Sequence, residues 1–410
     1  MKPKAISIAL ALITLMATAS HADTVLAGQA GGAFYRIHVP TAWNGDLVIW
    51  NHGFSLNPIG PVTFSDLGPL APVQLAEGYA VAASSYRQIG WSVFKTKNDL
   101  QSLLGVFEDN FGTPGEINLT GASLGGIVTA AAIEEANLGN VVGAYTFCGA
   151  LAGSRNWDAA LDIRLIYDAI CDAVPGASIP GGAEGLPAGS TRTFTDNAVA
   201  VDQCFGLFFP PGRTPAQQAR FDDFLAVTQI PESFIFTDVA FYTTFAMSDL
   251  VHSPTKLAGK VGTGNLTVTY SDPVVDATIE RVAPHPGKSK QLARSYTPTG
   301  DVGITRIVSL HTDKDGLVIV ENESEYASVV PPSNLTIAIV VEAVPTHCGF
   351  TGAEVAGGWE ALRAWVAGFP QPTAATVQAT CLALEPIFGG PCRIDPGFVI
   401  PDMDGRVPPR

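Results

Sequence analysis

One serine stands among glycines in residues 117–128, INLTGASLGGIV. Ser123 has Gly121 two positions before it and Gly125 two positions after it, which is the spacing G-x-S-x-G. Strand-forming residues precede the motif and small apolar residues follow it, so the sequence predicts a strand, a sharp turn and a helix. Such a turn lifts a serine hydroxyl out of the end of a sheet, where only small neighbours fit. Ser123 is therefore a candidate nucleophile; the alternative is a glycine-rich turn with an idle serine.

The residues around this motif predict the elements that would position it. Apolar runs predict strands at 34–40, 45–53, 78–86, 117–120, 141–147, 303–312 and 334–342, the first two as a hairpin. Helical patterns are found at 97–112, 125–139 and 352–368. Strands alternating with helices at this spacing predict the α/β class, with a mostly parallel sheet flanked by helices.

The alternation stops between residues 153 and 298. This stretch contains a Gly/Pro-rich loop and predicted helices at 214–229 and 231–251, and we interpret it as an inserted, mainly helical cap or lid. The chain then divides into a signal peptide (1–22), a core (23–152 and 299–370), the cap (153–298) and a C-terminal tail (371–410). We expect the tail to be irregular.

With a strand before Ser123 and a helix after it, the chain resembles the α/β-hydrolase fold over about residues 34–369, apart from the cap. The resemblance implies a nucleophile, an acid and a histidine in that order along the chain, each at the end of a strand. It also implies a serine hydrolase of the esterase and lipase kind, which needs no organic cofactor and no metal.

Four histidines follow Ser123 and are candidates for the general base. His252 and His285 fall in the expected cap, and His311 precedes the acid candidates. His347 follows the last apolar strand on a loop before the final helix, which is where the family has its catalytic histidine. We predict that His347 is the base.

The acid is expected just after the strand at 303–312. Asp315 and Asp313 are both available there. Family members often have the acid just before a small residue and Leu-Val, and Asp315 precedes Gly316-Leu317-Val318. We predict Asp315 as the acid, with Asp313 as the alternative.

Two backbone N–H groups are needed to stabilise the oxyanion of acyl transfer. The sequence WNHGF, at the end of an early strand, resembles the His-Gly oxyanion loop of the family. We expect the N–H groups of Phe54 and Leu124 to serve, with Gly53 as the near alternative. The other interpretation of His52-Gly53 is an ordinary turn at the end of a strand, and we expect His52 to hold the loop.

The six cysteines are even in number, which in an exported protein favours disulfides. Within the implied fold, Cys148 ends the strand after the elbow helix and Cys348 follows His347, so we pair these two. The other predicted pairs are Cys171–Cys204 and Cys381–Cys392. A bridge beside the histidine is similar to that of tannases and feruloyl esterases, but Ala122 stands where that subgroup has a cysteine. The bridge either fixes the histidine loop or only stabilises the protein.

The predicted helix at 231–251 is rich in aromatic residues. Phe241 and Phe245 are our candidates for substrate binding, since such side chains can line an acyl or aryl pocket. The alternative is that they pack the cap on the core.

Composition excludes other classes of function. The formal net charge is −15 and the chain has no run of Lys or Arg, so nucleic acid is not an expected partner. No C-x-x-C pair is accompanied by ligands at metal spacing, so no structural zinc is expected. Lys2 and Lys4, an apolar run and the small residue Ala22 are typical of a secretory signal, with cleavage near Ala22. No later segment predicts a membrane span.

Together these features predict a secreted or periplasmic serine hydrolase that cleaves carboxylic esters, either small or polymeric, through a Ser-His-Asp triad and an acyl-enzyme. The alternatives are an exported polyester depolymerase or a peptidase with the same triad. A non-catalytic binding protein on a hydrolase scaffold is the alternative of another class. The sequence predicts no oligomeric state.

Overall fold

A computed structural model describes residues 23–208 and 212–410, so the predicted signal peptide lies outside the described residues. The chain forms one eight-stranded sheet in the order β1-β2-β4-β3-β5-β6-β7-β8. The strands are β1 Thr24–Ala30, β2 Ala33–Val39, β3 Leu47–Asn51, β4 Ala80–Ser84, β5 Ile117–Ala122, β6 Val141–Phe147, β7 Arg306–Thr312 and β8 Leu335–Val340. From β4 to β8 all neighbours are parallel.

The predicted hairpin is wrong, because β2 does not pair with β3. β2 pairs antiparallel with β1 and with β4, and β4 lies between β2 and β3. The hairpin is instead β1–β2, joined at Gly31 and Gly32, which have φ of 58° and 94°. Two consecutive residues with positive φ suit a tight two-residue turn. β1 escaped prediction because it is an edge strand with no buried residue, so it lacks the apolar alternation of the other strands.

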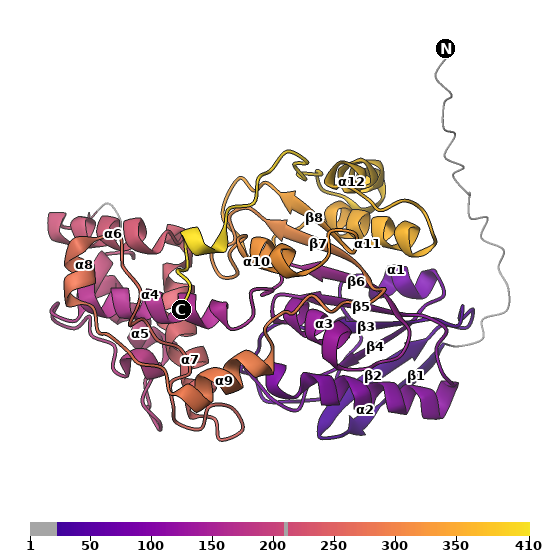
Figure 1. Ribbon diagram of the computed structural model, residues 1–410, viewed down its shortest axis with the longest axis horizontal. Coiled ribbons are helices and arrows are strands. Elements are labelled where there is room, and N and C mark those ends of the chain that lie inside the picture. Colours follow the sequence, from indigo (N-terminus) through magenta and orange to yellow (C-terminus); the bar gives the residue numbers. More distant parts are fainter. Residues whose placement is uncertain (1–22, 209–211) are drawn as a thin grey trace, which may run out of the picture.

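Helices cover both faces of the sheet (Figure 1). The helices of the described residues are α1 Ala71–Ala76, α2 Val93–Phe111, α3 Leu124–Glu135, α4 Arg155–Cys171, α5 Phe194–Phe205, α6 Pro215–Thr228, α7 Met247–His252, α8 Pro273–Thr278, α9 Pro286–Ser295, α10 Asn322–Val329, α11 Gly352–Val366 and α12 Ala374–Phe388. Alternate residues of β3 enter different cores: Ile49 packs in the cluster that contains α2 and α3, and Val48 in the cluster that contains α11. Both faces of this strand are therefore buried, as in other parallel sheets.

Between β6 and β7 the chain forms helices α4 to α9, which lie mostly to one side of the sheet (Figure 1). The predicted helix at 231–251 is a continuous helical stretch whose central part, Phe236–Ala246, is a π-helix. Long π-helices are rare and often mark functional sites.

The same stretch, Glu232–His252, is the one helix among the described residues that is long and apolar enough to cross a membrane. It meets this description by length and composition only. In its most apolar 18-residue segment, 61% is buried inside the protein. The core helix of a soluble protein has the same properties.

The C-terminal segment is more regular than expected. α12 begins at the N-cap Thr373, whose side chain accepts from the N–H of Thr376, and it packs along α11. Gly357 of α11 allows the backbone of Cys381 to approach closely. The prediction of an irregular tail is therefore wrong for 374–388. The apolar residues of this helix are partly exposed, so the sequence lacks a clear amphipathic pattern there.

Candidate active site

Ser123 lies in a sharp turn between β5 and α3. Its backbone has φ 56° and ψ −123°, a strained conformation that proteins hold mainly at functional turns. The N–H of Ser123 donates to the carbonyl of Phe147 (3.0 Å), and its own carbonyl accepts from Gly126 (2.9 Å) and Ala150 (3.2 Å). The end of β6 and the loop after it therefore hold the strained turn in place.

The glycines around this serine are required by close backbone contacts. A β-carbon on Gly121 would collide with the carbonyl of Gly125, and one on Gly125 would collide with the carbonyl of Asn51 at the end of β3. Backbone atoms cannot move aside as a flexible side chain can. The spacing of the motif thus reflects how tightly the turn packs against its neighbours.

The structure brings Ser123, His347 and Asp315 together. Nε2 of His347 lies 2.9 Å from Oγ of Ser123, and Nδ1 lies 2.7 Å from Oδ2 of Asp315. With its hydrogen on Nδ1, the imidazole leaves a lone pair on Nε2 for the serine proton. The side chain of His347 is 23% exposed and that of Asp315 is fully buried. A substrate can therefore approach the imidazole while its carboxylate partner stays out of water.

The carboxylate of Asp315 is oriented by its own turn. Its Oδ1 accepts from the N–H groups of Leu317 and Val318, both at 3.0 Å, which leaves Oδ2 for His347. Asp313, the alternative acid, instead accepts from the N–H of Glu342 at 2.8 Å. The carboxylate that contacts the imidazole is that of Asp315.

The expected oxyanion donors are the N–H groups of Leu124, directly after the serine, and of Phe54, in the loop after β3. Leu124 is the first residue of α3, so its N–H has no partner within the helix. Among the described residues no hydrogen bond is recorded from the N–H of Phe54. A β-carbon on Gly53 would lie 3.4 Å from Cβ of Ser123, so this loop runs directly beside the serine. The arrangement leaves both N–H groups available to an oxyanion.

His52 holds this loop. Its ring stacks on Tyr86 at a centroid distance of 4.1 Å, and its Nδ1–H donates to the carbonyl of Gly53 at 2.7 Å. Burial lowers the pKa of His52 and so favours the neutral ring, whose Nδ1–H tautomer makes this contact. The hydroxyl of Tyr86 donates to the carbonyl of His52 (3.3 Å).

The cysteines form the three pairs expected from the sequence: Cys148–Cys348, Cys171–Cys204 and Cys381–Cys392. Cys348 directly follows His347, and its Sγ lies 3.5 Å from Nε2 of that histidine. Cys148 directly follows β6, so the bridge ties the histidine loop to the centre of the sheet. In the part of the chain that the structure describes, these two cysteines and His347 are the one cluster with metal-ligand spacing, and both sulfurs are committed to the disulfide.

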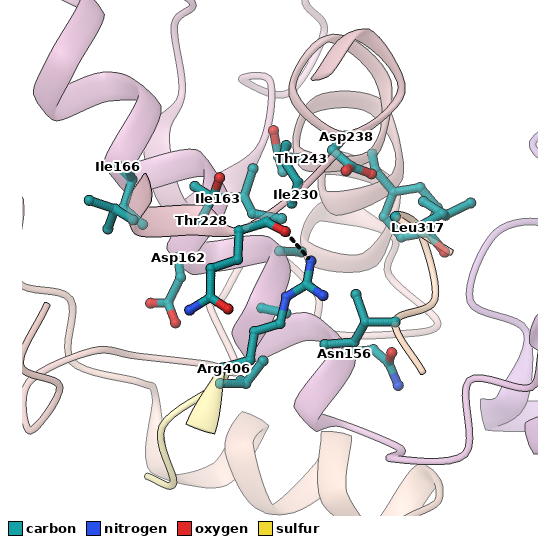
Figure 2. Close-up of a pocket in the computed structure, with 18 of the residues that line it drawn as sticks. Asn156, Asp162, Ile163, Ile166, Thr228, Ile230, Asp238, Thr243, Leu317 and Arg406 are labelled. Carbon is teal, nitrogen blue, oxygen red and sulfur yellow. Dashed lines mark hydrogen bonds between the residues drawn. The ribbon is translucent and has the colours of Figure 1, made fainter. Parts of the chain in front are cut away.

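A cavity of about 160 Å³ lies beside this site, between α4, the π-helix and the turn after Asp315 (Figure 2). Ala150, whose N–H donates to the carbonyl of Ser123, is part of its wall. Arg406 extends into the cavity from the C-terminal segment and donates to the carbonyl of Gln229 at 3.0 Å. The walls of the cavity are partly apolar and partly polar, with isoleucine side chains beside hydroxyl and charged groups.

Asp238 lies on the cavity wall and is buried. Its Oδ2 has no hydrogen-bond partner among the described residues. Burial, and secondly the charge of Asp315, raises the pKa of Asp238 well above its ordinary value, so the neutral acid is favoured. Asp238 was not predicted from the sequence, although it is the only charged residue between Phe234 and Ala246, in a run of apolar and hydroxyl-bearing residues.

The predicted substrate-binding residues, Phe241 and Phe245, lie in one aromatic row. The ring centroids of Phe241 and Phe54 lie 6.5 Å apart, and those of Phe245 and Phe241 lie 6.0 Å apart. Neither is part of the cavity wall, whereas the next residue, Tyr242, is. The ring of Tyr242 also packs on that of Phe54, at a centroid distance of 5.3 Å, so Tyr242 connects the loop that carries Phe54 to the cavity.

The sheet order, the crossover helices and the strained serine turn between β5 and α3 define an α/β-hydrolase fold. No protein-family model matches the chain, and no curated protein matches it in sequence.

Solved structures with a similar fold include three hydrolases. Lipase A of Candida antarctica in its closed state is 12% identical, with a TM-score of 0.43 over 92% of this chain and 80% of that one. Feruloyl esterase B of Aspergillus oryzae is 14% identical, with a TM-score of 0.46 over 88% and 84%. The esterase RhEst1 of Rhodococcus sp. ECU1013 is 16% identical, with a TM-score of 0.36 over 84% and 98%. Similarity at this level does not identify a substrate.

Proposed function

We propose that this protein is an exported serine hydrolase that cleaves carboxylic esters. The observation that carries the proposal is the continuous contact from Asp315 through His347 to Ser123, at 2.7 Å and 2.9 Å. A strained serine, an imidazole within hydrogen-bond reach and a buried carboxylate that orients it are the requirements of acyl transfer.

In the proposed reaction, Oγ of Ser123 attacks the acyl carbon while Nε2 of His347 takes the hydroxyl proton. The positive charge that develops on the imidazole is balanced by Asp315. The oxyanion is stabilised by the N–H groups of Phe54 and Leu124. His347 then gives its proton to the leaving alcohol, and water, activated by the same imidazole, releases the acid from Ser123.

The mixed cavity is the proposed site for the acyl group, and residues 153–298 are proposed to act as the cap that selects it. Tyr242 supports this assignment, because it belongs to the cavity wall and also packs against Phe54 beside the serine. Substrate preference in enzymes of this kind depends on such walls rather than on the triad.

Export is proposed from the N-terminal sequence pattern together with the three disulfides, which persist in oxidising compartments. Cleavage after Ala22 would leave a mature chain that begins at Asp23.

The test uses the purified mature protein with a short p-nitrophenyl ester and a serine-reactive phosphonate. We expect the wild type to hydrolyse the ester and to be labelled at Ser123, and Ser123→Ala to do neither. A panel of soluble esters, insoluble polyester and peptides then separates the esterase from the depolymerase and the peptidase. A protein that is folded, unlabelled and inactive on all three would contradict the proposal and favour a binding role.

A further inference from the structure

His311, near the end of β7, is a buried histidine that the proposed triad does not use. Its side chain is fully buried, and it lies four residues before Asp315. Buried histidines are usually neutral, because burial disfavours the charged ring. His311 differs from such histidines because both of its ring nitrogens contact oxygen atoms.

Both ring nitrogens of His311 face oxygen atoms. Nε2 lies 2.8 Å from the carbonyl oxygen of Val318, and Nδ1 lies 3.0 Å from Oε1 of Glu323. A backbone carbonyl can only accept, so Nε2 carries a hydrogen. Oε1 of Glu323 also accepts from the hydroxyl of Ser309 at 2.6 Å, as a carboxylate oxygen does. A second hydrogen on Nδ1 satisfies this contact and makes the ring an imidazolium.

The charges around this ring favour that state. Nε2 lies 4.0 Å from Oδ2 of Asp315, the oxygen that contacts His347. Burial alone would lower the pKa of His311, but the hydrogen bond and charge of Glu323, together with the charge of Asp315, raise it above its ordinary value.

Two titratable groups act on His311 directly: Glu323 of α10 and Asp315 after β7. Tyr326 of α10 lies near Glu323, and Asp238 of the π-helix and His347 lie near Asp315.

We propose that His311 is a positioning residue, held as an imidazolium by Glu323, that balances the charge of the Asp315 carboxylate and keeps its turn closed beneath His347. The proposal rests on the proposed function. Through its Nε2–H the ring also holds the carbonyl of Val318, whose N–H donates to Asp315. The contacts then run from Glu323 through His311, Asp315 and His347 to Ser123.

This arrangement has a consequence for the pH dependence of activity. A fixed positive charge near Asp315 and His347 opposes the uptake of another proton by that pair. The wild type therefore stays active to lower pH than a protein without the charge. Because Glu323 partly balances His311, we expect an effect of about half a pH unit at the effective dielectric of protein sites.

Two variants remove the charge by different routes. His311→Gln removes the ring, and Glu323→Gln removes the carboxylate that holds the second proton on it. We expect both to move the acidic limb of the kcat/KM profile to higher pH, measured on a non-ionisable ester by product quantification. Thr146→Val is the matched control, because Thr146 donates to Ser309 in the same buried network but carries no charge. It should leave the limb in place.

The protonation state itself is measured without any activity, by ¹⁵N NMR of histidine-labelled protein, with the His311 signals assigned by their loss in His311→Gln. We expect the second hydrogen on the His311 ring to persist to higher pH in the wild type than in Glu323→Gln. A ring that loses its second hydrogen at the same pH in the wild type and in Glu323→Gln, or an acidic limb that does not move in either variant, would overturn the proposal. An inactive wild type with a doubly protonated His311 would count against the proposed function and against the effect on the triad, but not against the imidazolium.

Discussion

Oδ2 of Asp315 lies 2.7 Å from Nδ1 of His347, although 32 residues separate them in the chain. The contact follows from the topology of the sheet. β7 and β8 are parallel neighbours, with Thr312 opposite Val340, so the loops after both strands emerge at the same edge. A parallel pair thus brings an acid and a base together that no local sequence pattern joins.

This geometry predicts that Asp315→Asn will lower kcat far more than Asp313→Asn. An amide at position 315 removes the charge that balances the imidazolium and disturbs the orientation of the ring, which typically costs about 10⁴-fold in kcat. Asp313→Asn keeps an oxygen that can accept from Glu342 and should cost less than about threefold. Steady-state kinetics on a short p-nitrophenyl ester measures both. Comparable losses in the two variants would mean that Asp315 is not the acid.

Ser123 and His347 could be predicted from the sequence because their signals are local: a glycine spacing, and a histidine directly after an apolar strand. The hairpin was predicted wrongly because β4, the partner of β2, comes from more than forty residues further along the chain. The cavity could not be predicted, since its wall combines α4, a π-helix, the turn after Asp315 and the C-terminal segment. Phe241 and Phe245 were named because their segment is rich in aromatic residues, and that composition does not tell which of its side chains line a cavity.

The close backbone contacts of the glycines predict how strongly two Gly→Ala variants differ in stability. Gly125→Ala places a β-carbon against the carbonyl of Asn51, and we expect it to lower the free energy of unfolding by about 2 kcal/mol or more, or to prevent folding. Gly105→Ala is the matched control in α2, where a β-carbon meets nothing within 4 Å. It should stabilise the protein by up to about 1 kcal/mol, because alanine is the better helix former. Denaturant unfolding of both proteins measures the difference, and a Gly125→Ala protein as stable as the wild type would contradict this account of the turn.

Removal of the Cys148–Cys348 bridge should affect catalysis more than removal of Cys171–Cys204. Without the first bridge the loop that carries His347 is free to shift, and a misplacement of about 1 Å can cost about 10²-fold in rate. The second bridge joins α4 to α5, away from the serine, so its loss should lower stability with kcat nearly unchanged. The comparison uses both double Cys→Ser variants, with kcat and thermal unfolding measured for each. Equal kcat values in the two variants would leave the bridge beside His347 with only a structural role.

The raised pKa of Glu77 predicts that the stability of the protein depends on pH. Burial raises the pKa of Glu77 to about 7, although Trp359 donates to it at 3.0 Å and Arg363 lies nearby. The folded protein thus binds this proton more tightly than the unfolded chain, so stability is lost as pH rises from about 4.5 to about 7. Glu77→Gln keeps an acceptor for Trp359 and removes this loss. The free energy of unfolding of this variant should exceed that of the wild type by on the order of 2 kcal/mol at pH 8 and by little at pH 4.

The control for this prediction is Glu108→Gln, at an exposed position of α2. Denaturant unfolding at pH 4, 6 and 8 should give the same stability difference from the wild type at each pH for this variant. A Glu77→Gln protein that behaves in the same way would show that the ionisation of Glu77 is not linked to folding.

The proposed acyl site predicts that filling the cavity changes chain-length preference. Ile163 of α4 lies on the cavity wall, so Ile163→Trp should shorten the space available to the acyl group (Figure 2). We expect kcat/KM to fall more than tenfold for a long acyl chain and less than about twofold for an acetate ester, because a pocket discriminates by the methylenes it can bury. Ile170→Trp, on the same helix but outside the cavity wall, is the matched control and should leave the ratio between the two esters unchanged. If both variants change all esters by the same factor, the acyl group binds elsewhere, and Phe241 and Phe245 become the residues to change next.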